Sequence, residues 1–434
     1  MRRLNLQLTV FFIVTALCGV MLGQQQSAPG DTTDNASANG GVKDIVYDVQ
    51  QLWGEDYFFR GVPHFVQMGS SDIYVQDGPN LKPERIVQGG QDPQWSADGR
   101  KIAFLGFGTT GLNIGVGERV ESRQVQVINA DGSARRSITQ VPTGVWDFAW
   151  SPVEEKIAYC EQSEDDRTAV VVINGDGSNR TEVTKMGSVR CAVGRPVLKA
   201  KVQADKKDML GKSVEGGKAT ILVGINSIYD QVFDTTWGQI IGVPTLDWSP
   251  DGERIAFTSA SGSKTVIAVV GKDGGNPKGV VNGYAARWSP DGKRLLFRHD
   301  SETDPPITSI WTANTDGTDP RRVLDNETAE FGLTWFPDGK SIVFASERER
   351  KNHAEIFRIN VDGTGLQKIA TARDYAFSSP IVSPDGTKLI VEADSPWTSR
   401  GGEEDSSLWL IDLSSHRQER LTKGSHPSVV WEKR

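Results

Sequence analysis

Short stretches of alternating apolar and polar residues recur along the chain, each interrupted by a turn rich in Pro, Asp and Gly. From Leu246 to Phe257, one stretch ends at Trp248, a Ser-Pro-Asp-Gly turn follows, and a second apolar stretch begins at Arg254. Pro fixes φ, Gly accepts positive φ, and Ser and Asp can bond their own backbone, so the chain reverses direction at low cost. The pattern predicts two antiparallel strands joined by a tight turn.

A second hairpin follows each copy of the first. It places an alternating stretch before an Asp-Gly turn, as in VVVINGDGS from Val170 to Ser178 and IFRINVDGT from Ile356 to Thr364. A short stretch such as RRVL, from Arg321 to Leu324, completes the unit. Each unit is therefore predicted to be one antiparallel sheet of four strands.

The units recur at a regular spacing. Each is anchored by a large apolar residue just before the first turn, and the anchors are Trp95, Trp150, Trp248, Trp288, Trp335, Val382 and Trp431. Successive anchors are 55, 98, 40, 47, 47 and 49 residues apart. A period in the forties with several strands per unit is typical of a β-propeller. We predict an all-β chain that forms a single propeller of four-stranded blades.

Both ends of the chain are predicted to build one blade. Pro427 to Arg434 supplies an anchor-bearing strand with nothing after it, and three strands precede the first anchor, namely His64–Met68, Asp72–Gly78 and Glu84–Gln88. Pairing the N-terminal strands with the C-terminal strand would close the ring and remove its exposed sheet edges.

The long interval between Trp150 and Trp248 leaves the number of blades open. With the composite blade, the anchors give seven blades. The interval holds either a degenerate eighth blade, with candidate strands Pro196–Val202 and Lys218–Ile225, or an insertion carried on one blade.

The first residues of the chain predict export. Arg2 and Arg3 precede an apolar run from Leu4 to Gly23, as in a secretory signal. The run is also just long enough to span a bilayer, so an uncleaved anchor is the alternative. The stretch from Gln24 to Gly41 has no aromatic or branched aliphatic residue and cannot form a core. We expect a signal peptide or signal anchor over 1–23, a disordered linker over 24–44, and the propeller over 45–434.

The net charge limits the classes of partner, and the cysteines bear on the cellular compartment. The formal net charge is −8 and no cluster of Lys and Arg is found, which argues against nucleic acid. The chain would meet a membrane only through an uncleaved N-terminal anchor. In an oxidising compartment Cys160 and Cys191 could form a disulfide, or Cys160 could be a small buried residue in a strand.

The repeat resembles a known family. The WSPDG-x-x-IAF unit followed by an I-x-V-x-N-x-DG hairpin is similar to the TolB-type propeller repeat, over roughly His64 to the end. The resemblance implies a propeller in the bacterial cell envelope, so we expect a periplasmic or secreted protein. TolB itself carries a small α/β domain before its propeller, and Asp44 to Val62 is too short for such a domain. A role in the Tol-Pal system does not follow.

Functional residues are expected where the sequence varies. The stereotyped turns should share one face of the ring, while the other face collects the longer loops, such as Gly106–Arg123 and Ala393–Ser407, and the connectors between blades. The first strands should line a central channel, and five polar residues near their entrances are candidate ligand-binding residues: Asp92, Gln94, Asp147, Asp247 and Arg287. The structural alternative is that they bind neighbouring loop backbones.

Other chemistry is not indicated by local motifs. The Asp-Gly strings match hairpin turns and do not continue into a calcium loop, and the histidines His64, His299, His353, His416 and His426 show no metal-ligand spacing. No G-x-S-x-G elbow is present. We therefore predict no metal, no cofactor and no catalytic residues. The predicted function is non-catalytic binding of an envelope protein, peptide or glycan, and the alternative is a channel-mouth enzyme such as a polysaccharide lyase or hydrolase.

Overall fold

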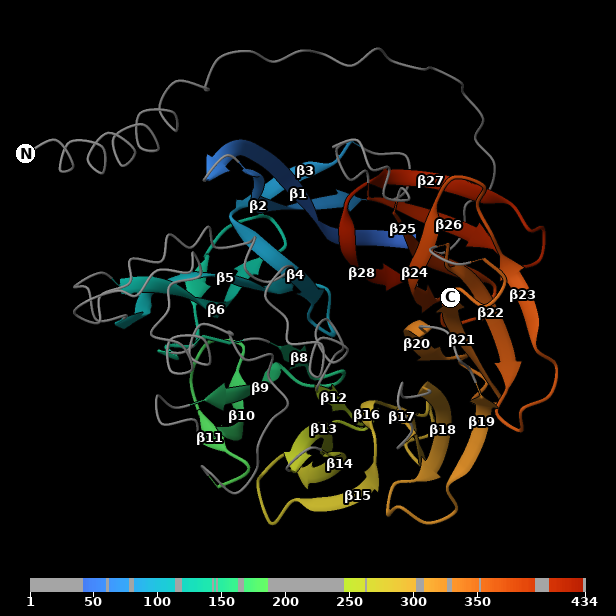
Figure 1. Cartoon of the computed structure of the whole chain (residues 1–434). Coiled ribbons are helices and arrows are strands. Elements are labelled where there is room, and N and C mark those ends of the chain that lie inside the picture. Colours follow the sequence, from blue (N-terminus) through green and yellow to red (C-terminus); the bar gives the residue numbers. More distant parts are fainter. Residues whose placement is uncertain are drawn as a thin grey trace, which may run out of the picture. The chain divides into compact units, whose positions relative to one another are not determined.

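The computed structural model shows seven four-stranded antiparallel sheets arranged in a ring (Figure 1). It describes residues 42–59, 62–77, 82–113, 119–142, 144–145, 147–162, 168–185, 246–261, 264–301, 308–325, 330–350, 353–394 and 406–431. The prediction of a single all-β propeller is confirmed, and of the two blade counts left open by the sequence the structure has seven. Residues 1–41, which include the expected signal and most of the linker, lie outside the described residues.

Each blade is a meander of four strands that follow one another in the sheet. Blade 1 combines β28 (Ser425–Trp431), β1 (Val42–Phe59), β2 (Val62–Asp77) and β3 (Glu84–Gln88); blade 2 contains β4 (Gly90–Trp95), β5 (Lys101–Asn113), β6 (Arg119–Asn129) and β7 (Arg136–Ser137). Blade 3 contains β8 (Phe148–Trp150), β9 (Lys156–Gln162), β10 (Thr168–Asn174) and β11 (Thr181–Glu182); blade 4 contains β12 (Leu246–Trp248), β13 (Arg254–Ser261), β14 (Lys264–Gly271) and β15 (Lys278–Asn282). Blade 5 contains β16 (Tyr284–Trp288), β17 (Arg294–Asp300), β18 (Thr308–Asn314) and β19 (Arg321–Asp325); blade 6 contains β20 (Glu330–Trp335), β21 (Ser341–Ser346), β22 (Glu355–Asn360) and β23 (Gln367–Ala370). Blade 7 contains β24 (Ala376–Val382), β25 (Lys388–Asp394), β26 (Ser407–Asp412) and β27 (Gln418–Lys423).

The two ends of the propeller join in blade 1, as predicted. The last strand, β28, pairs antiparallel with β1, and Val46 faces Ser428 across this pair. The expected strand at His64–Met68 is wrong as a separate element, because these residues continue β2 and pair with Trp53–Tyr57 of β1. The first strand after the linker is β1, which begins at Val42, inside the segment that we assigned to the linker.

Two hairpins are longer than predicted. In blade 1, β1 and β2 stay paired from Asp44 and Asp77 to their ends at Phe59 and Val62. In blade 2, Gly106–Arg123 was expected to be a loop, but β5 and β6 pair as far as Asn113 and Arg119. The residues beyond Leu105 extend the ladder after an irregularity between Phe107 and Gly111.

The recurring turns are held by their own side chains. In the turn of blade 4, the Ser249 hydroxyl donates to Asp251, accepts the N–H of Arg254 at 2.9 Å, and Gly252 adopts a φ of 70°. In the second type of turn, Asp131 Oδ1 accepts both the N–H and the hydroxyl of Ser133. These carboxylates are engaged by the turns that they stabilise, which confirms the hairpin interpretation.

The anchoring tryptophans connect neighbouring blades. Trp248 Nε1 donates to the Ala149 carbonyl at 3.0 Å, and Trp288 Nε1 donates to the Asp247 carbonyl at 3.1 Å. The apolar cores lie between blades, as in the cluster that joins Leu105 and Val127 of blade 2 to Trp150 of blade 3. Burial between adjacent sheets thus stabilises the ring.

The bond from Trp248 to Ala149 also decides the number of blades. It joins blades 3 and 4 directly, and β8 and β12 contact each other. No blade separates them, so the alternative of an eighth blade is wrong. The candidate strands Pro196–Val202 and Lys218–Ile225 lie outside the described residues.

Two further predictions concern Cys160 and the membrane. Cys160 is buried and disulfide-bonded, and the cysteine that it bonds lies outside the described residues. Among the residues that the structure describes, no helix is long and apolar enough to cross a membrane.

Candidate functional site

Most first strands contain, near their start, a residue in the left-handed region of backbone conformation. The strand then bulges before it reaches the anchor position, and the residue three places before the anchor has positive φ: Asp92 (51°), Ala285 (57°), Gly332 (63°), Ser379 (48°) and His426 (49°). In blade 1 the anchor position belongs to Val429 and not to Trp431, because Ser428 binds the Trp95 N–H as Gln94 binds that of Trp150. The bulge turns a side chain toward the start of each first strand.

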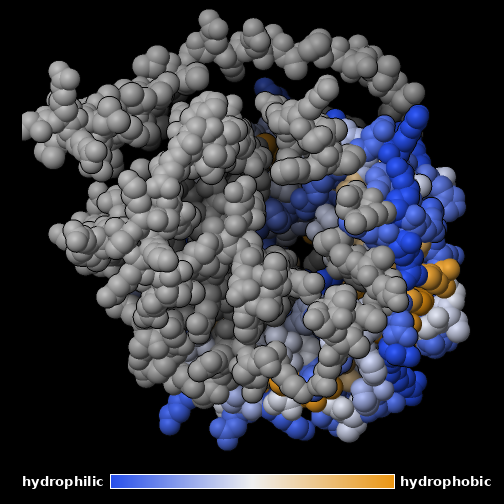
Figure 2. All heavy atoms as spheres, in the orientation of Figure 1, coloured by the Kyte–Doolittle hydropathy of each residue, from blue (hydrophilic) through white to orange (hydrophobic). Residues whose placement is uncertain are grey.

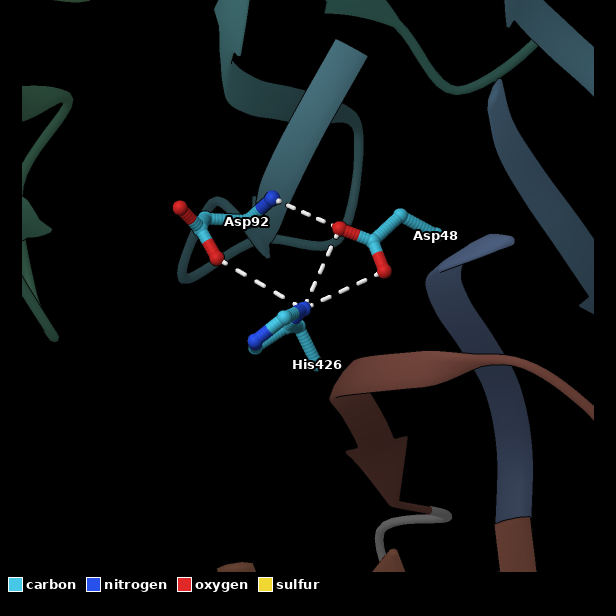
Figure 3. A group of neighbouring side chains, drawn as sticks. All are labelled: Asp48, Asp92 and His426. Carbon is cyan, nitrogen blue, oxygen red and sulfur yellow. Dashed lines mark hydrogen bonds and ion pairs between the residues drawn. The ribbon is translucent and has the colours of Figure 1, made fainter. Parts of the chain in front are cut away.

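Two of these equivalent positions meet at the junction of blades 1 and 2. His426 of β28 and Asp92 of β4 lie beside Asp48 of β1, and we call these three residues the closure group (Figure 3). His426 Nδ1 lies 3.2 Å from each carboxylate oxygen of Asp48 and 3.7 Å from Asp92 Oδ1. Asp48 is fully buried, whereas the side chains of Asp92 and His426 are 39% and 47% exposed. A buried carboxylate therefore holds an imidazole that remains open to solvent.

Asp48 is oriented by two further donors. The Ser425 hydroxyl donates to Asp48 Oδ1 at 2.6 Å, and the Asp92 N–H donates to Asp48 Oδ2 at 3.1 Å. Hydrogen bonds of this kind fix the direction of a carboxylate and compensate its burial. The bond from Asp92 exists because the bulge aims its N–H inward.

The charges around His426 are mainly negative. The backbone N–H of His426 donates to Glu392 of β25 at 3.4 Å. Partial desolvation of the ring would by itself lower the pKa of His426, but the charges of Asp48, Asp92 and Glu392 and the bond to Asp48 hold that pKa well above its usual value. Burial raises the pKa of Glu392 to about 7, with His426 opposing the shift and Asp394 and Asp48 adding to it. The group favours a cation at the position of the imidazole.

The structure places the five candidate residues of the sequence in different settings. Asp247 and Arg287 come together, with 3.2 Å between Oδ1 and Nη1, and Asp247 Oδ2 accepts the Trp288 N–H at 2.9 Å. Burial raises the pKa of Asp247, while Arg287 and the Trp288 N–H oppose the shift. This pair joins blades 4 and 5.

Gln94 and Asp147 also join neighbouring blades. The Gln94 amide donates to the Phe148 carbonyl at 3.0 Å and accepts the Trp150 N–H at 3.2 Å, and Asp147 accepts the Leu246 N–H at 3.2 Å. Both residues thus bind the backbone of the first strand of the next blade, β8 or β12. Of the five, Asp92 is the one that belongs to the closure group, and a ligand-binding role for the others stays a prediction.

Sequence reasoning missed Asp48 and His426. Their side chains come from strands 378 residues apart, so no local spacing relates them. A signal was present in the repeat, because aligning Val429 with the anchors places His426 at the position of Asp92. The choice of Trp431 as the anchor shifted the register by two residues and concealed this match.

Where the described residues are visible in Figure 2, hydrophilic residues predominate over apolar ones. The extended hairpins β1–β2 and β5–β6 belong to the same two blades that supply the closure group. Blades 1 and 2 thus have both the ionisable side chains of the closure group and the long strands β1, β2, β5 and β6.

Comparisons with known proteins agree with this architecture. Residues 239–428 match the TolB β-propeller domain family. A structure of oligogalacturonate lyase in complex with manganese has a TM-score of 0.50 and 13% identity, covering 86% of this chain and 85% of the other. The propeller domain of the Trilobed protease from Pyrococcus furiosus has a TM-score of 0.50 and 11% identity, covering 87% and 99%.

A TolB structure is also among the similar proteins. TolB from Acinetobacter baumannii has a TM-score of 0.44 and 14% identity, covering 88% of this chain and 82% of the other. No curated protein matches the chain. At these identities the two structures with a TM-score of 0.50 show a shared fold alone, and one is a lyase whereas the other belongs to a protease. The family match over residues 239–428 and the seven-bladed ring together support a TolB-like β-propeller for this chain.

Proposed function

We propose that this chain is an exported, non-catalytic propeller of the bacterial cell envelope that binds a protein, peptide or glycan partner beside Asp92 and His426. One observation carries the proposal. At the equivalent bulge positions of blades 5, 6 and 7 the chain has Ala285, Gly332 and Ser379, so the scaffold does not require an ionisable side chain there. At blades 1 and 2 it places an imidazole and a carboxylate, both partly exposed. Exposed polar groups that the fold does not need are expected to serve binding.

The envelope location rests on three observations. The sequence begins with a charged and then apolar segment that is typical of export. Cys160 is disulfide-bonded, as is common in oxidising compartments. The family that matches residues 239–428 is named for TolB, whose repeat implies the bacterial envelope.

The extended hairpins support a macromolecular partner. They lengthen β1, β2, β5 and β6 on the two blades that carry the closure group, which provides additional backbone surface beside it. Long edges of this kind can contact an extended peptide or a glycan chain over several residues. A partner that contacts both hairpins would cover Asp92 and His426.

Site-specific photocrosslinking in cells tests this proposal. A photoreactive residue at Gln91, next to Asp92, is expected to give discrete adducts, and Asp92→Asn in the same chain is expected to weaken them. The matched position is Ser133, in an exposed Asp-Gly turn. Equal adducts from both positions, or none from Gln91, would contradict binding at the closure group.

Catalysis is the second candidate, favoured by the pairing of His426 with Asp48. Because Nδ1 faces the carboxylate, Nε2 lies on the opposite edge of the ring (Figure 3). This arrangement fixes the orientation of an imidazole that could transfer protons. Turnover of polysaccharides or peptides by the purified chain, lost in His426→Asn, would support an enzyme and overturn the non-catalytic proposal.

A further inference from the structure

The closure group has the donor atoms and the spacing of a metal site. It offers two carboxylate oxygens and one imidazole nitrogen, all within 4.8 Å of one another. An ion with bonds of about 2.1 Å holds neighbouring ligand atoms roughly 3.0–3.4 Å apart in octahedral or tetrahedral geometry. The distances from His426 Nδ1, 3.2 Å to Asp48 and 3.7 Å to Asp92, lie close to this range. Small side-chain rotations would bring all three atoms to one ion.

The positions of these donor atoms are fixed by neighbouring bonds. The Ser425 hydroxyl and the Asp92 N–H orient the buried Asp48 carboxylate, and Glu392 accepts the backbone N–H of His426 at the bulge. Polar partners of this kind commonly hold ligating side chains in place and raise metal affinity. Asp92 and His426 both start from left-handed backbone, which sends their side chains to the same point.

The charge at this point also favours a cation. Two carboxylates face one imidazole, and a third, Glu392, lies behind it. With three protein ligands, and with Asp92 and His426 partly exposed, further coordination positions are open to water or to an oxygen of a bound molecule. The burial of Asp48 excludes water from one side of the ion.

The geometry points to a divalent transition-metal site formed by Asp48, Asp92 and His426 at the junction of blades 1 and 2. One imidazole and two carboxylates are a donor set that suits Mn²⁺ and Zn²⁺. This inference goes beyond the proposed function and does not depend on it, because the ion binds the free chain. The ion would connect β28, β1 and β4, the three strands at which the ring closes.

Calorimetric titration of the chelator-treated full chain with Mn²⁺, and separately with Zn²⁺, tests the site. The expected result is saturable binding of one ion per chain by at least one metal. Asp92→Asn and His426→Asn are the ligand variants, since Asn tolerates left-handed backbone. Asp325→Asn is the matched control, because Asp325 is an exposed carboxylate paired with Arg322 on β19.

The outcomes separate a metal site from an ion pair that only closes the ring. Both ligand variants should lose at least tenfold in affinity, while Asp325→Asn should bind like the original chain. Circular dichroism of each variant without metal shows whether it remains folded. Failure of both metals to saturate at one equivalent, or unchanged binding by folded Asp92→Asn, overturns the inference. Partner crosslinking at Gln91 can succeed or fail independently of either result.

Discussion

The Nδ1 atom of His426 lies 3.2 Å from both carboxylate oxygens of Asp48, although 378 residues separate the two in sequence. His426 belongs to the last strand and Asp48 to the first, so this contact lies where the chain completes its ring. The bond from Ser425 to Asp48 lies at the same junction. Closure and the candidate site therefore share residues.

Removing the Asp48 carboxylate should weaken the ring at this junction. Asp48→Ala leaves the Ser425 hydroxyl, the Asp92 N–H and the His426 imidazole without their acceptor. The expected loss in the free energy of unfolding is about 3–5 kcal/mol, as for a buried ion pair with one partner removed. Urea unfolding measures it. Asp92→Asn is the control and should lose less than about 1 kcal/mol, since its side chain is partly exposed and its N–H is kept; equal losses would contradict the central place of Asp48.

The contribution of one hydrogen bond between blades to the free energy of unfolding can be measured by comparing two tryptophans. Trp248 Nε1 donates to Ala149, whereas Trp150 Nε1 is buried without a hydrogen-bond partner. Both side chains are buried, so replacement by Phe removes similar volume. Trp248→Phe should lose about 0.5–1.5 kcal/mol more in unfolding free energy than Trp150→Phe. Thermal and urea unfolding compare them, and a larger loss in Trp150→Phe would refute the role of this bond.

The chain should lose stability in strongly alkaline solution. Burial raises the pKa of Tyr47, Tyr159 and Tyr284 from 10.0 to about 12. The neutral hydroxyl is favoured in the folded state, so its contribution is complete below pH 10 and is lost as pH rises to about 12, by up to about 2–3 kcal/mol for each tyrosine. Urea unfolding between pH 8 and 12 measures the loss, which should be smaller in Tyr284→Phe. Tyr375→Phe, at a partly exposed ring, is the comparison, and an equal reduction there would be evidence against the tyrosines as the cause.

The bulge of blade 6 requires glycine for reasons of space as well as conformation. Gly332 has a φ of 63°, and a Cβ there would lie 2.6 Å from the Ser379 nitrogen. Gly89 has a φ of 75° with nothing within 4 Å of such a Cβ. Gly89→Ala should lose about 1 kcal/mol from backbone strain alone, and Gly332→Ala clearly more. Comparable melting temperatures for the two variants would show that blade 7 yields to the added methyl group.

The repeat allowed most of the ring to be predicted, because Trp248 and its turn recur in nearly the same form in other blades. Local patterns failed where tertiary contacts decide the outcome. The sequence predicts a loop over Gly106–Arg123, but pairing with β6 extends the strand to Asn113. The residues His64–Met68 alternate like a separate strand. They continue β2 because β1 is long enough to pair with them through Trp53–Tyr57. The seven-blade count needed the contact between Trp248 and Ala149.

The candidate site was predictable only in part. Asp92 was identified by its place at the start of a first strand, but its neighbours come from β1 and β28 and are brought together by closure. Asp247 and Gln94 occupy similar places and instead bind the next blade. All three side chains are polar and lie at similar positions, so the sequence alone does not tell a residue that binds the next blade from one that is partly exposed and available to a ligand.

The closure group forms only when β28 pairs with β1, so the proposed binding depends on completion of the ring. An intermediate in which these strands are still apart can contain six finished blades, yet Asp48 and His426 do not meet in it. The proposed binding site would be absent from this intermediate, not merely weakened. Recovery of the proposed partner or metal binding during refolding should consequently lag behind the formation of most of the β-sheet.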